Sequence, residues 1–269
     1  MCIAVFMWQS HPMYPFLLLH NRDEIYTRPT QPLAWWPGDR ILGGRDEQAG
    51  GTWLASTRDG KLAFITNFRE CEEHPNPKSR GELPLCFLES NKSPWEFAEE
   101  ILKEADQYNG FNLILVDICS RTMVYVSNRP KKDNLSVCMV TPGIHVLTNA
   151  SLDAAWPKVK GERLRHNFKE LIDQYGESEF PIKEMVEKLM TNKIKDEESL
   201  LPGIHPPHRE YPLSSIFVEA DFPWGRYGTR SSSAFFVKSN GEASFYEKYL
   251  DDVDGKWKEK MMTCMINGA

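Results

Sequence analysis

Alternation of apolar and polar positions divides the chain up to residue 149 mainly into short strands. Turn residues separate these segments, and Asp59-Gly60 has the composition of a tight hairpin turn. Strands that follow one another so closely favour antiparallel pairing. We expect strands over residues 2–8, 15–19, 51–56, 61–67, 111–118, 122–128 and 144–149.

Apolar spacings of three and four residues predict helices in the middle of the chain. One begins at residue 94, with Ser93 as its N-cap and Pro94 at its first position. Two more amphipathic helices are expected over residues 156–175 and 182–190. Four prolines within residues 201–212 predict a long surface loop without helix. Strands over residues 215–220, 233–238 and 243–249 follow, the last two joined by an Asn240-Gly241 turn.

This order of strands and helices contains no repeat and no clean linker. It predicts one α+β domain over residues 1–269, in which helices cover a central antiparallel sheet.

Charge and apolar run length exclude several classes of function. The chain has 32 Lys and Arg against 38 Asp and Glu, a net charge of −6, which argues against a nucleic-acid partner. No apolar run reaches the roughly 20 residues needed to cross a bilayer, and the N-terminus lacks the pattern of a signal peptide. The cytoplasm is therefore the expected location.

Six cysteines are scattered without a Cys-x-x-Cys pair, which argues against a disulfide scaffold or a zinc ribbon. Most are expected to be buried small side chains. His205 and His208 flank two prolines without a nearby carboxylate or cysteine, so no metal site is predicted.

Cys2 is the most informative single residue. A small side chain after Met1 permits removal of the initiator methionine, which would leave a thiol beside its own α-amine. The pKa of such an amine, about 7.7–8.0, lets it accept the thiol proton without a histidine. Two alternatives remain open: a buried cysteine without chemistry at the start of a strand, and a palmitoylation site.

The polar residues Asn21, Arg22, Asp23 and Glu24, here termed the NRDE run, directly follow the predicted strand 15–19. A carboxylate there could hold the Cys2 amine and Arg22 could lower the pKa of the thiol, whereas a solvated charged turn is the alternative.

Two asparagines close other predicted strands. Asn67 and Asn149 each end an apolar strand, where an amide could donate to a developing oxyanion or simply form a turn.

Several sequence blocks in one order carry a family resemblance over nearly the whole chain. They are Met1-Cys2-Ile3, the NRDE run with Tyr26, Arg28 and Pro29, Gly50-Gly51-Thr52-Trp53-Leu54, Thr66-Asn67, Tyr108-Asn109-Gly110-Phe111-Asn112-Leu113, Thr141-Pro142-Gly143, Leu147-Thr148-Asn149-Ala150 and Tyr227-Gly228-Thr229-Arg230. On these blocks the chain resembles the NRDE family, which is the transport and Golgi organisation protein 2 family.

That family in turn resembles the cysteine N-terminal nucleophile hydrolases, such as bile-salt hydrolases and penicillin V acylases. The resemblance implies an αββα sandwich of antiparallel sheets between helical layers. It also implies a site in which Cys2 is the nucleophile, Asp23 holds the α-amine, Asn67 and Asn149 lie near the oxyanion, and Arg230 is the late arginine. Those hydrolases usually carry an arginine three residues before the aspartate, where this chain has His20.

The family resemblance also implies a ligand. It points to a cytoplasmic protein, with association with mitochondria or Golgi, that binds and mobilises haem or a similarly bulky acyl-type ligand, with links to acyl-CoA metabolism and secretion. The NRDE run would contact that ligand, haem would be cargo, and no cofactor would be required. The alternative is an amidohydrolase or acyltransferase that depends on Cys2. The oligomeric state stays open.

Overall fold

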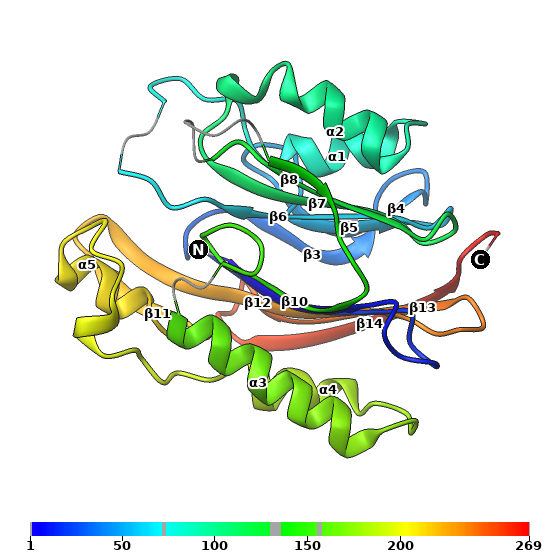
Figure 1. The fold of residues 1–269 in the computed structure, drawn as a ribbon. Helices are drawn as coiled ribbons and strands as arrows, with labels where there is room; N and C mark the ends of the chain where they lie inside the picture. Colours follow the sequence, from blue (N-terminus) through cyan, green and yellow to red (C-terminus); the bar gives the residue numbers. More distant parts are fainter. Residues whose placement is uncertain (1, 72–73, 130–135, 155–157, 269) are drawn as a thin grey trace. The chain divides into compact units, whose positions relative to one another are not determined.

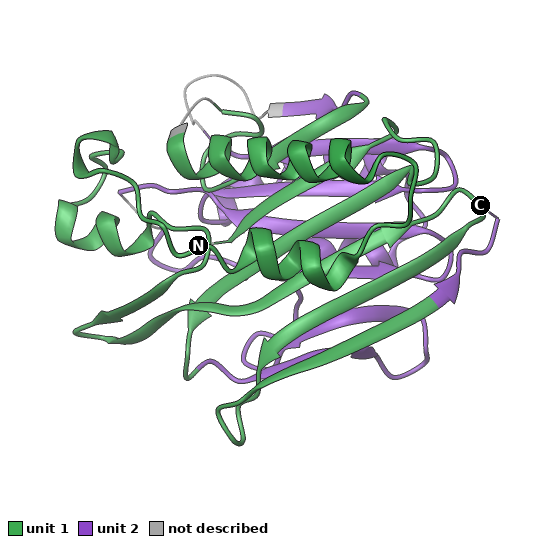
Figure 2. Cartoon of the chain, turned by 90° about the horizontal axis from the view of Figure 1, so that it is seen from below, with its two compact units in different colours: residues 1–27, 142–263 green, residues 28–141, 264–269 purple. Residues whose placement is uncertain are grey.

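A computed structural model describes residues 2–71, 74–129, 136–154 and 158–268 (Figure 1). The chain forms two compact units, each built from separate stretches of sequence (Figure 2). Unit 1 comprises Met1–Thr27 and Pro142–Thr263, and unit 2 comprises Arg28–Thr141 and Cys264–Ala269. The prediction of a single domain over residues 1–269 stays a prediction.

Unit 1 contains a seven-stranded antiparallel sheet in the order β10-β1-β2-β12-β13-β14, with β11 paired to β12. The last two residues of β14 are assigned to unit 2. The strands are β1 (Ile3–Trp8), β2 (Phe16–Ile25), β10 (Gly143–Leu147), β11 (Glu219–Phe222), β12 (Gly225–Val237), β13 (Glu242–Leu250) and β14 (Trp257–Met265).

The NRDE run lies inside β2 and not in a turn. β2 continues to Ile25 because β1 pairs on one side and β12 on the other, with Asn21 opposite both Ile3 and Ser232. Asn21, Arg22 and Asp23 are buried, so the expectation of a strand ending at residue 19, and the alternative of a solvated turn, are both wrong. A polar run remains in a buried strand when its neighbours satisfy its hydrogen bonds.

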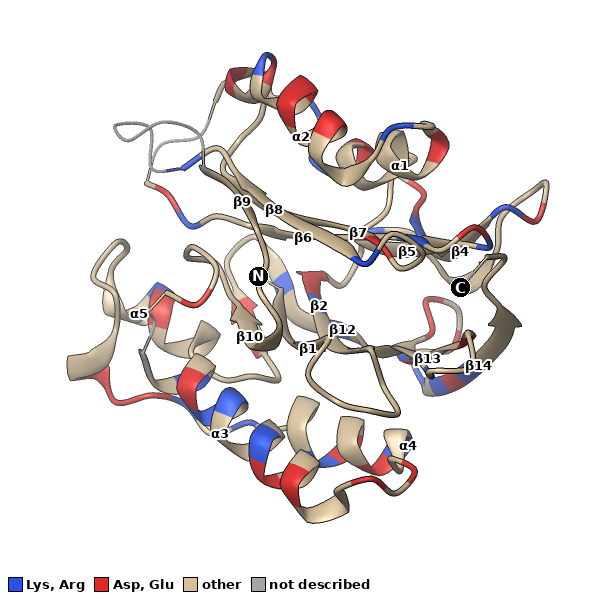
Figure 3. Ribbon diagram, turned by 45° about the vertical axis from the view of Figure 1, so that its right-hand side comes forward, with Lys and Arg blue, Asp and Glu red and all other residues tan. Residues whose placement is uncertain are grey.

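The long helix of unit 1 packs on one face of this sheet. Leu164, Phe168 and Ile172 of α3 (Lys158–Tyr175) belong to the same core cluster as Ile3 and Val5 of β1, as the amphipathic spacing predicts. Figure 3 shows charges of both signs along α3. The expected start of this helix at Trp156 lies outside the described residues.

The predicted helix 182–190 is present in two parts. α4 (Ile182–Met185) continues as a π-helical turn, η2 (Val186–Met190). Short π-helical segments inside helices often occur near functional sites.

The proline-rich segment 201–212 contains a helix, contrary to expectation. α5 (Pro207–Glu210) begins with a proline at its first turn, where a missing N–H costs no hydrogen bond. The buried carboxylate of Glu210 accepts backbone N–H groups of residues 203–205, which folds the loop back on itself. Unit 1 also contains the 3-10 turns η3 (Glu198–Leu200) and η4 (Tyr211–Leu213).

Unit 2 contains a second seven-stranded antiparallel sheet, in the order β3-β4-β5-β6-β7-β8-β9. Its helices α1 and α2 pack on that sheet, as seen in Figure 1. The elements are β3 (Thr30–Trp35), β4 (Ile41–Asp46), β5 (Leu54–Thr57), β6 (Lys61–Asn67), α1 (Glu82–Glu89), α2 (Pro94–Leu102), η1 (Ala105–Gln107), β7 (Phe111–Asp117), β8 (Thr122–Ser127) and β9 (Ser136–Met139).

The structure confirms the predicted start of α2 and the predicted hairpin turn at Asp59-Gly60 in unit 2. Ser93 and Glu96 form a reciprocal capping box with Pro94 in the first turn of α2. Gly60 has φ +88° and donates to Thr57, which closes the predicted hairpin turn.

Among the described helices, none is long and apolar enough to cross a bilayer. The expectation that most cysteines are buried is wrong. Cys2 is buried, Cys264 is half-buried, and the other four are exposed.

Candidate active site around Cys2

Cys2 directly precedes β1, between two neighbouring strands of unit 1. β1 pairs with β10 so that Ala4 lies opposite Leu147, and with β2 so that Ile3 lies opposite Asn21. Continuing the same antiparallel registers brings Asn149 and Arg22 to either side of Cys2. All three residues are buried.

Asp23 is fixed by a relay of hydrogen bonds from β12. The Thr229 hydroxyl donates to Asp23 Oδ1 at 2.7 Å and accepts the backbone N–H of Val218 at 2.9 Å. Tyr227 donates its hydroxyl to the carbonyl of Asp23 at 3.1 Å. Gly228, between them, lies so near β11 that a Cβ would be 2.2 Å from the oxygen of Val218, so only glycine fits there.

Burial dominates the electrostatics of this cluster. It raises the pKa of the Cys2 thiol, the Asp23 carboxylate raises it further, and the Arg22 guanidinium acts in the opposite direction. Burial also raises the pKa of Asp23, against the hydrogen bond from Thr229 and the positive charge of Lys160. The Asp23 carboxylate is therefore close enough to the thiol to influence the pKa of Cys2.

Arg230 occupies a β-bulge beside this cluster. The register between β2 and β12 shifts between Thr229, opposite Asp23, and Ser231, opposite Arg22, which leaves Arg230 as the extra residue. Its guanidinium donates to the carbonyl of Ile25 at 3.2 Å and forms an ion pair with Asp252. Bulges commonly redirect a side chain next to an active site.

Asn21 connects the sheet to two distant segments of unit 1. Its Nδ2 donates to the carbonyl of Met190, at the end of the π-helical turn, at 2.8 Å and to that of Ile216 at 3.0 Å. Both protons of this amide thus hold the backbone, which gives Asn21 a structural role.

The remaining predicted positions are distributed as follows. Asp23 and Arg230 lie on β2 and β12 of unit 1, Cys2 directly precedes β1, and Asn149 follows the end of β10 by two residues. Asn67 ends β6 of unit 2. Glu24 follows Asp23 in β2, half-buried, and accepts the backbone N–H of Ile25 at 2.8 Å. Met1 lies outside the described residues.

Lys160 and Thr229 also belong to this site, although neither is among the predicted site residues. The ammonium of Lys160 on α3 donates to the carbonyls of Leu213 and Ser215, at 2.9 and 3.4 Å. Thr229 was within reach of sequence reasoning, because it directly precedes Arg230 in a recognisable block. Lys160 was not, because nothing near it in sequence distinguishes it from a surface lysine.

His20 lies two residues before Arg22 in β2 and is also buried. Burial and the Arg22 charge lower the pKa of His20 to about 3, from an ordinary 6.5. The imidazole therefore stays neutral at physiological pH, where an arginine at this position would carry a fixed positive charge.

The depressed pKa of His20 predicts a specific loss of stability in acid. Between pH 6.5 and 3 the unfolded state binds a proton that the folded state refuses, so the unfolding free energy falls as the pH falls. Relative to His20→Gln, the native chain should lose about 2 kcal/mol between pH 7 and 5. Urea unfolding at both pH values measures this difference. The raised pKa of Asp23 acts in both proteins and cancels in the comparison. Parallel losses in the two proteins would refute the assignment.

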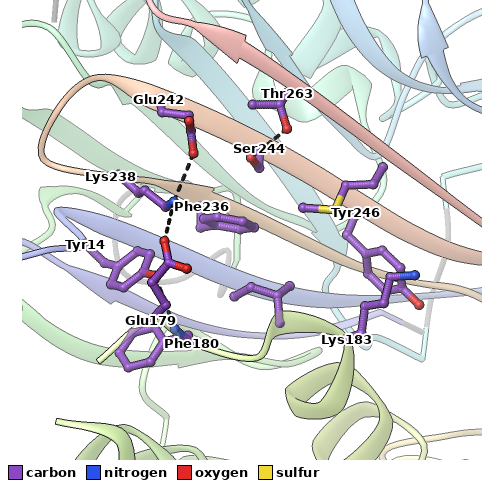
Figure 4. Close-up of a pocket in the computed structure, with 12 residues that line it drawn as sticks. Tyr14, Glu179, Phe180, Lys183, Phe236, Lys238, Glu242, Ser244, Tyr246 and Thr263 are labelled. Atoms are coloured by element: carbon purple, nitrogen blue, oxygen red, sulfur yellow. Dashed lines mark hydrogen bonds and ion pairs between the residues drawn. The ribbon is translucent and has the colours of Figure 1, made fainter. Parts of the chain in front are cut away.

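Unit 1 also contains a pocket of about 340 Å³ between β12, β13, β14 and the start of α4 (Figure 4). At its rim Lys238 lies between Glu179 and Glu242, at 2.7 and 3.1 Å, and its charge is thus neutralised within the pocket. None of the predicted site residues lines it. In the described part of the chain, no three acidic, histidine or cysteine side chains gather as a metal centre would require.

The geometry around Cys2 suits acyl chemistry. A thiol next to a backbone N–H and a buried carboxylate supplies a nucleophile and a group that can hold an ammonium, and the Arg22 guanidinium acts on the thiol with its positive charge.

Comparisons with known proteins identify the fold and the family of this chain. The chain is similar to a variant of conjugated bile acid hydrolase from Clostridium perfringens, with TM-score 0.52, 11% identity and coverage of 98% of this chain and 97% of that one, which confirms the N-terminal nucleophile hydrolase-like α+β fold. It is 31% identical to the Transport and Golgi organization 2 homolog of Mus musculus, over 96% of both chains, and 25% identical to Transport and Golgi organization protein 2 of Drosophila melanogaster, again over 96% of both. The family model described as Transport and Golgi organisation 2 matches residues 1–252. The chain belongs to the Transport and Golgi organisation 2 family.

Proposed function

We propose that this protein acts on a bulky acyl-type ligand and that Cys2, freed by removal of Met1, is the nucleophile. The observation that carries the proposal is the position of the Cys2 thiol, buried beside the backbone N–H and the carboxylate of Asp23, which Thr229 fixes at 2.7 Å. The proposal places the protein in the cytoplasm, and its Golgi association rests on the family name.

The chemistry proceeds through a thioester. The Cys2 sulfur attacks the carbonyl carbon of an amide or thioester, while the α-amine of Cys2 accepts the thiol proton and passes it to the departing amine or thiol. Asn149 and Arg230 stabilise the oxyanion of the tetrahedral intermediate. Water then attacks the acyl-Cys2 thioester, releases the carboxylic acid and restores the thiol, or another acceptor takes the acyl group in place of water.

Intact mass spectrometry tests this proposal directly. Protein purified from its natural cell should lack Met1, and brief incubation with palmitoyl-CoA followed by an acid quench should add one palmitoyl group. Peptide mapping should locate the acyl group on Cys2, and prior alkylation of the thiol with iodoacetamide should prevent it. A retained Met1, or an unmodified Cys2 at saturating palmitoyl-CoA, would refute the proposal.

A carrier function is the second candidate, because burial raises the pKa of the Cys2 thiol and so disfavours the nucleophilic thiolate. In this proposal the same region holds haem or a long acyl chain without reacting. Absorbance titration with haem and calorimetry with palmitoyl-CoA should then give dissociation constants below about 10 μM, equivalent to about 7 kcal/mol. Saturable binding without an acyl adduct favours the carrier, and an adduct favours the enzyme.

A further inference from the structure

A buried polar stripe crosses three strands of the unit 1 sheet beside Cys2. Arg22 of β2 lies opposite Ser231 of β12, and His20 lies opposite Ser233. Ser233 lies in turn opposite Glu247 of β13. Directly paired residues project from the same face of a sheet, so these five side chains share one face.

The stripe contains opposite charges that water does not solvate. Arg22 is 4% exposed and Glu247 is 2% exposed. Charges buried to this extent are found paired, because leaving either one alone carries a large desolvation penalty. Lys248, the neighbour of Glu247, projects from the opposite face and bonds Glu187, so it is not the counter-ion of Glu247.

Small residues on the central strand leave room for these charges to meet. β2 and β13 flank β12, which puts their backbones about 10 Å apart. Long arginine and glutamate side chains can span this gap over Ser231 and Ser233, whose hydroxyls are buried and bond no other described group. Larger residues at either serine would fill the space.

We propose that Glu247 is a positioning residue that holds the Arg22 guanidinium across β12 and so keeps its positive charge beside Cys2. This inference rests on the proposed role of Cys2 as a nucleophile. It extends the site by one strand, to a residue 245 positions away in sequence that none of the recognised blocks contains.

The rate of Cys2 alkylation by iodoacetamide tests this role without any acyl substrate. Mapping the N-terminal peptide separates Cys2 from the exposed cysteines. In Glu247→Gln the midpoint of the rate–pH profile should move to higher pH, because Arg22 leaves the thiol, and the rate at pH 7 should fall about 3- to 10-fold. If Glu247 acted only by its own negative charge, its removal would move the midpoint to lower pH. That sign, or an unchanged profile, overturns the proposal.

Three further variants protect the test against misfolding and indirect effects. Glu242→Gln, a second β13 glutamate that pairs with Lys238 in the pocket, should leave the profile unchanged. Glu247→Asp keeps the charge on a shorter side chain and should restore at least half of the lost rate. In an Arg22→Gln background, Glu247→Gln should produce no further upward shift, whereas an undiminished shift would contradict the proposal. An acyl adduct missing in all variants, with the expected alkylation profiles, would refute the proposed function while leaving the Glu247 role intact.

Discussion

Replacing Cys2 by alanine or by serine lowers acyl turnover by about 1,000-fold or more while ligand binding survives, if the proposed chemistry is correct. The covalent step has no substitute nucleophile, because an alanine cannot attack and a serine hydroxyl ionises far less readily than a thiol. Hydrolysis of palmitoyl-CoA measures turnover, and calorimetry on the same variants measures binding. Both variants should fold, because serine is nearly isosteric with cysteine and alanine removes only one heavy atom from this small buried side chain.

Other outcomes of the Cys2 substitutions point to the carrier. A carrier that uses Cys2 as a haem ligand would show weaker haem binding and a shifted absorbance spectrum in both variants, with no turnover in any form. A carrier that holds its ligand by shape alone would respond to neither substitution. Turnover that survives Cys2→Ala would contradict the nucleophile assignment outright.

Asn21→Asp should be among the most destabilising single substitutions in this chain. The amide donates to the carbonyls of Met190 and Ile216, and a carboxylate there would face two oxygens without water. We expect a loss of about 3–5 kcal/mol in unfolding free energy, from two unsatisfied carbonyls and one buried charge. Asn21→Ala, which leaves the carbonyls unpaired without adding charge, should cost about 2–4 kcal/mol.

Urea unfolding followed by circular dichroism checks both values. Asn240→Asp is the matched control, since this exposed turn residue only accepts the N–H of Glu242 through a side-chain oxygen that aspartate also has. It should change stability by less than about 0.5 kcal/mol. A chain that tolerates Asn21→Asp as well as it tolerates Asn240→Asp would show that the two hydrogen bonds carry little of the fold.

The sequence predicts those elements whose local chemistry agrees with their final surroundings. The α2 capping box and the apolar face of α3 are local patterns and are confirmed. β2 was predicted too short because a polar run in a buried strand depends on partners in β12, about 200 residues later. β4 was missed since Gly43 and Gly44 resemble a turn, yet Gly43 lies where a Cβ would be 2.5 Å from Ala55.

The residues of the candidate site also separate into those that the sequence indicates and those that only the folded chain reveals. Family blocks single out Cys2, Asp23 and Arg230, but the hydroxyl of Thr229 on Asp23 joins residues 206 positions apart. Nothing in the local sequence of Lys160 or Glu247 indicates burial, because isolated charged residues are usually solvated. Strand register places Glu247 in the row of His20 and Ser233, and the packing of α3 on the sheet brings Lys160 close enough to Asp23 to affect the pKa of that carboxyl.

Because the two units alternate along the sequence, the ribosome synthesises one part of unit 1 before most of unit 2 and the other part after it. β1 and β2 leave the exit tunnel first, yet their sheet neighbours β10 and β12 are made only after residues 28–141. At about 5–20 residues per second, that intervening stretch takes on the order of 10 s to translate. At the end of this interval all seven strands of the unit 2 sheet have been translated, whereas the apolar residues 16–19 still have no partner from β12. These residues of the nascent chain are therefore candidates for chaperone binding.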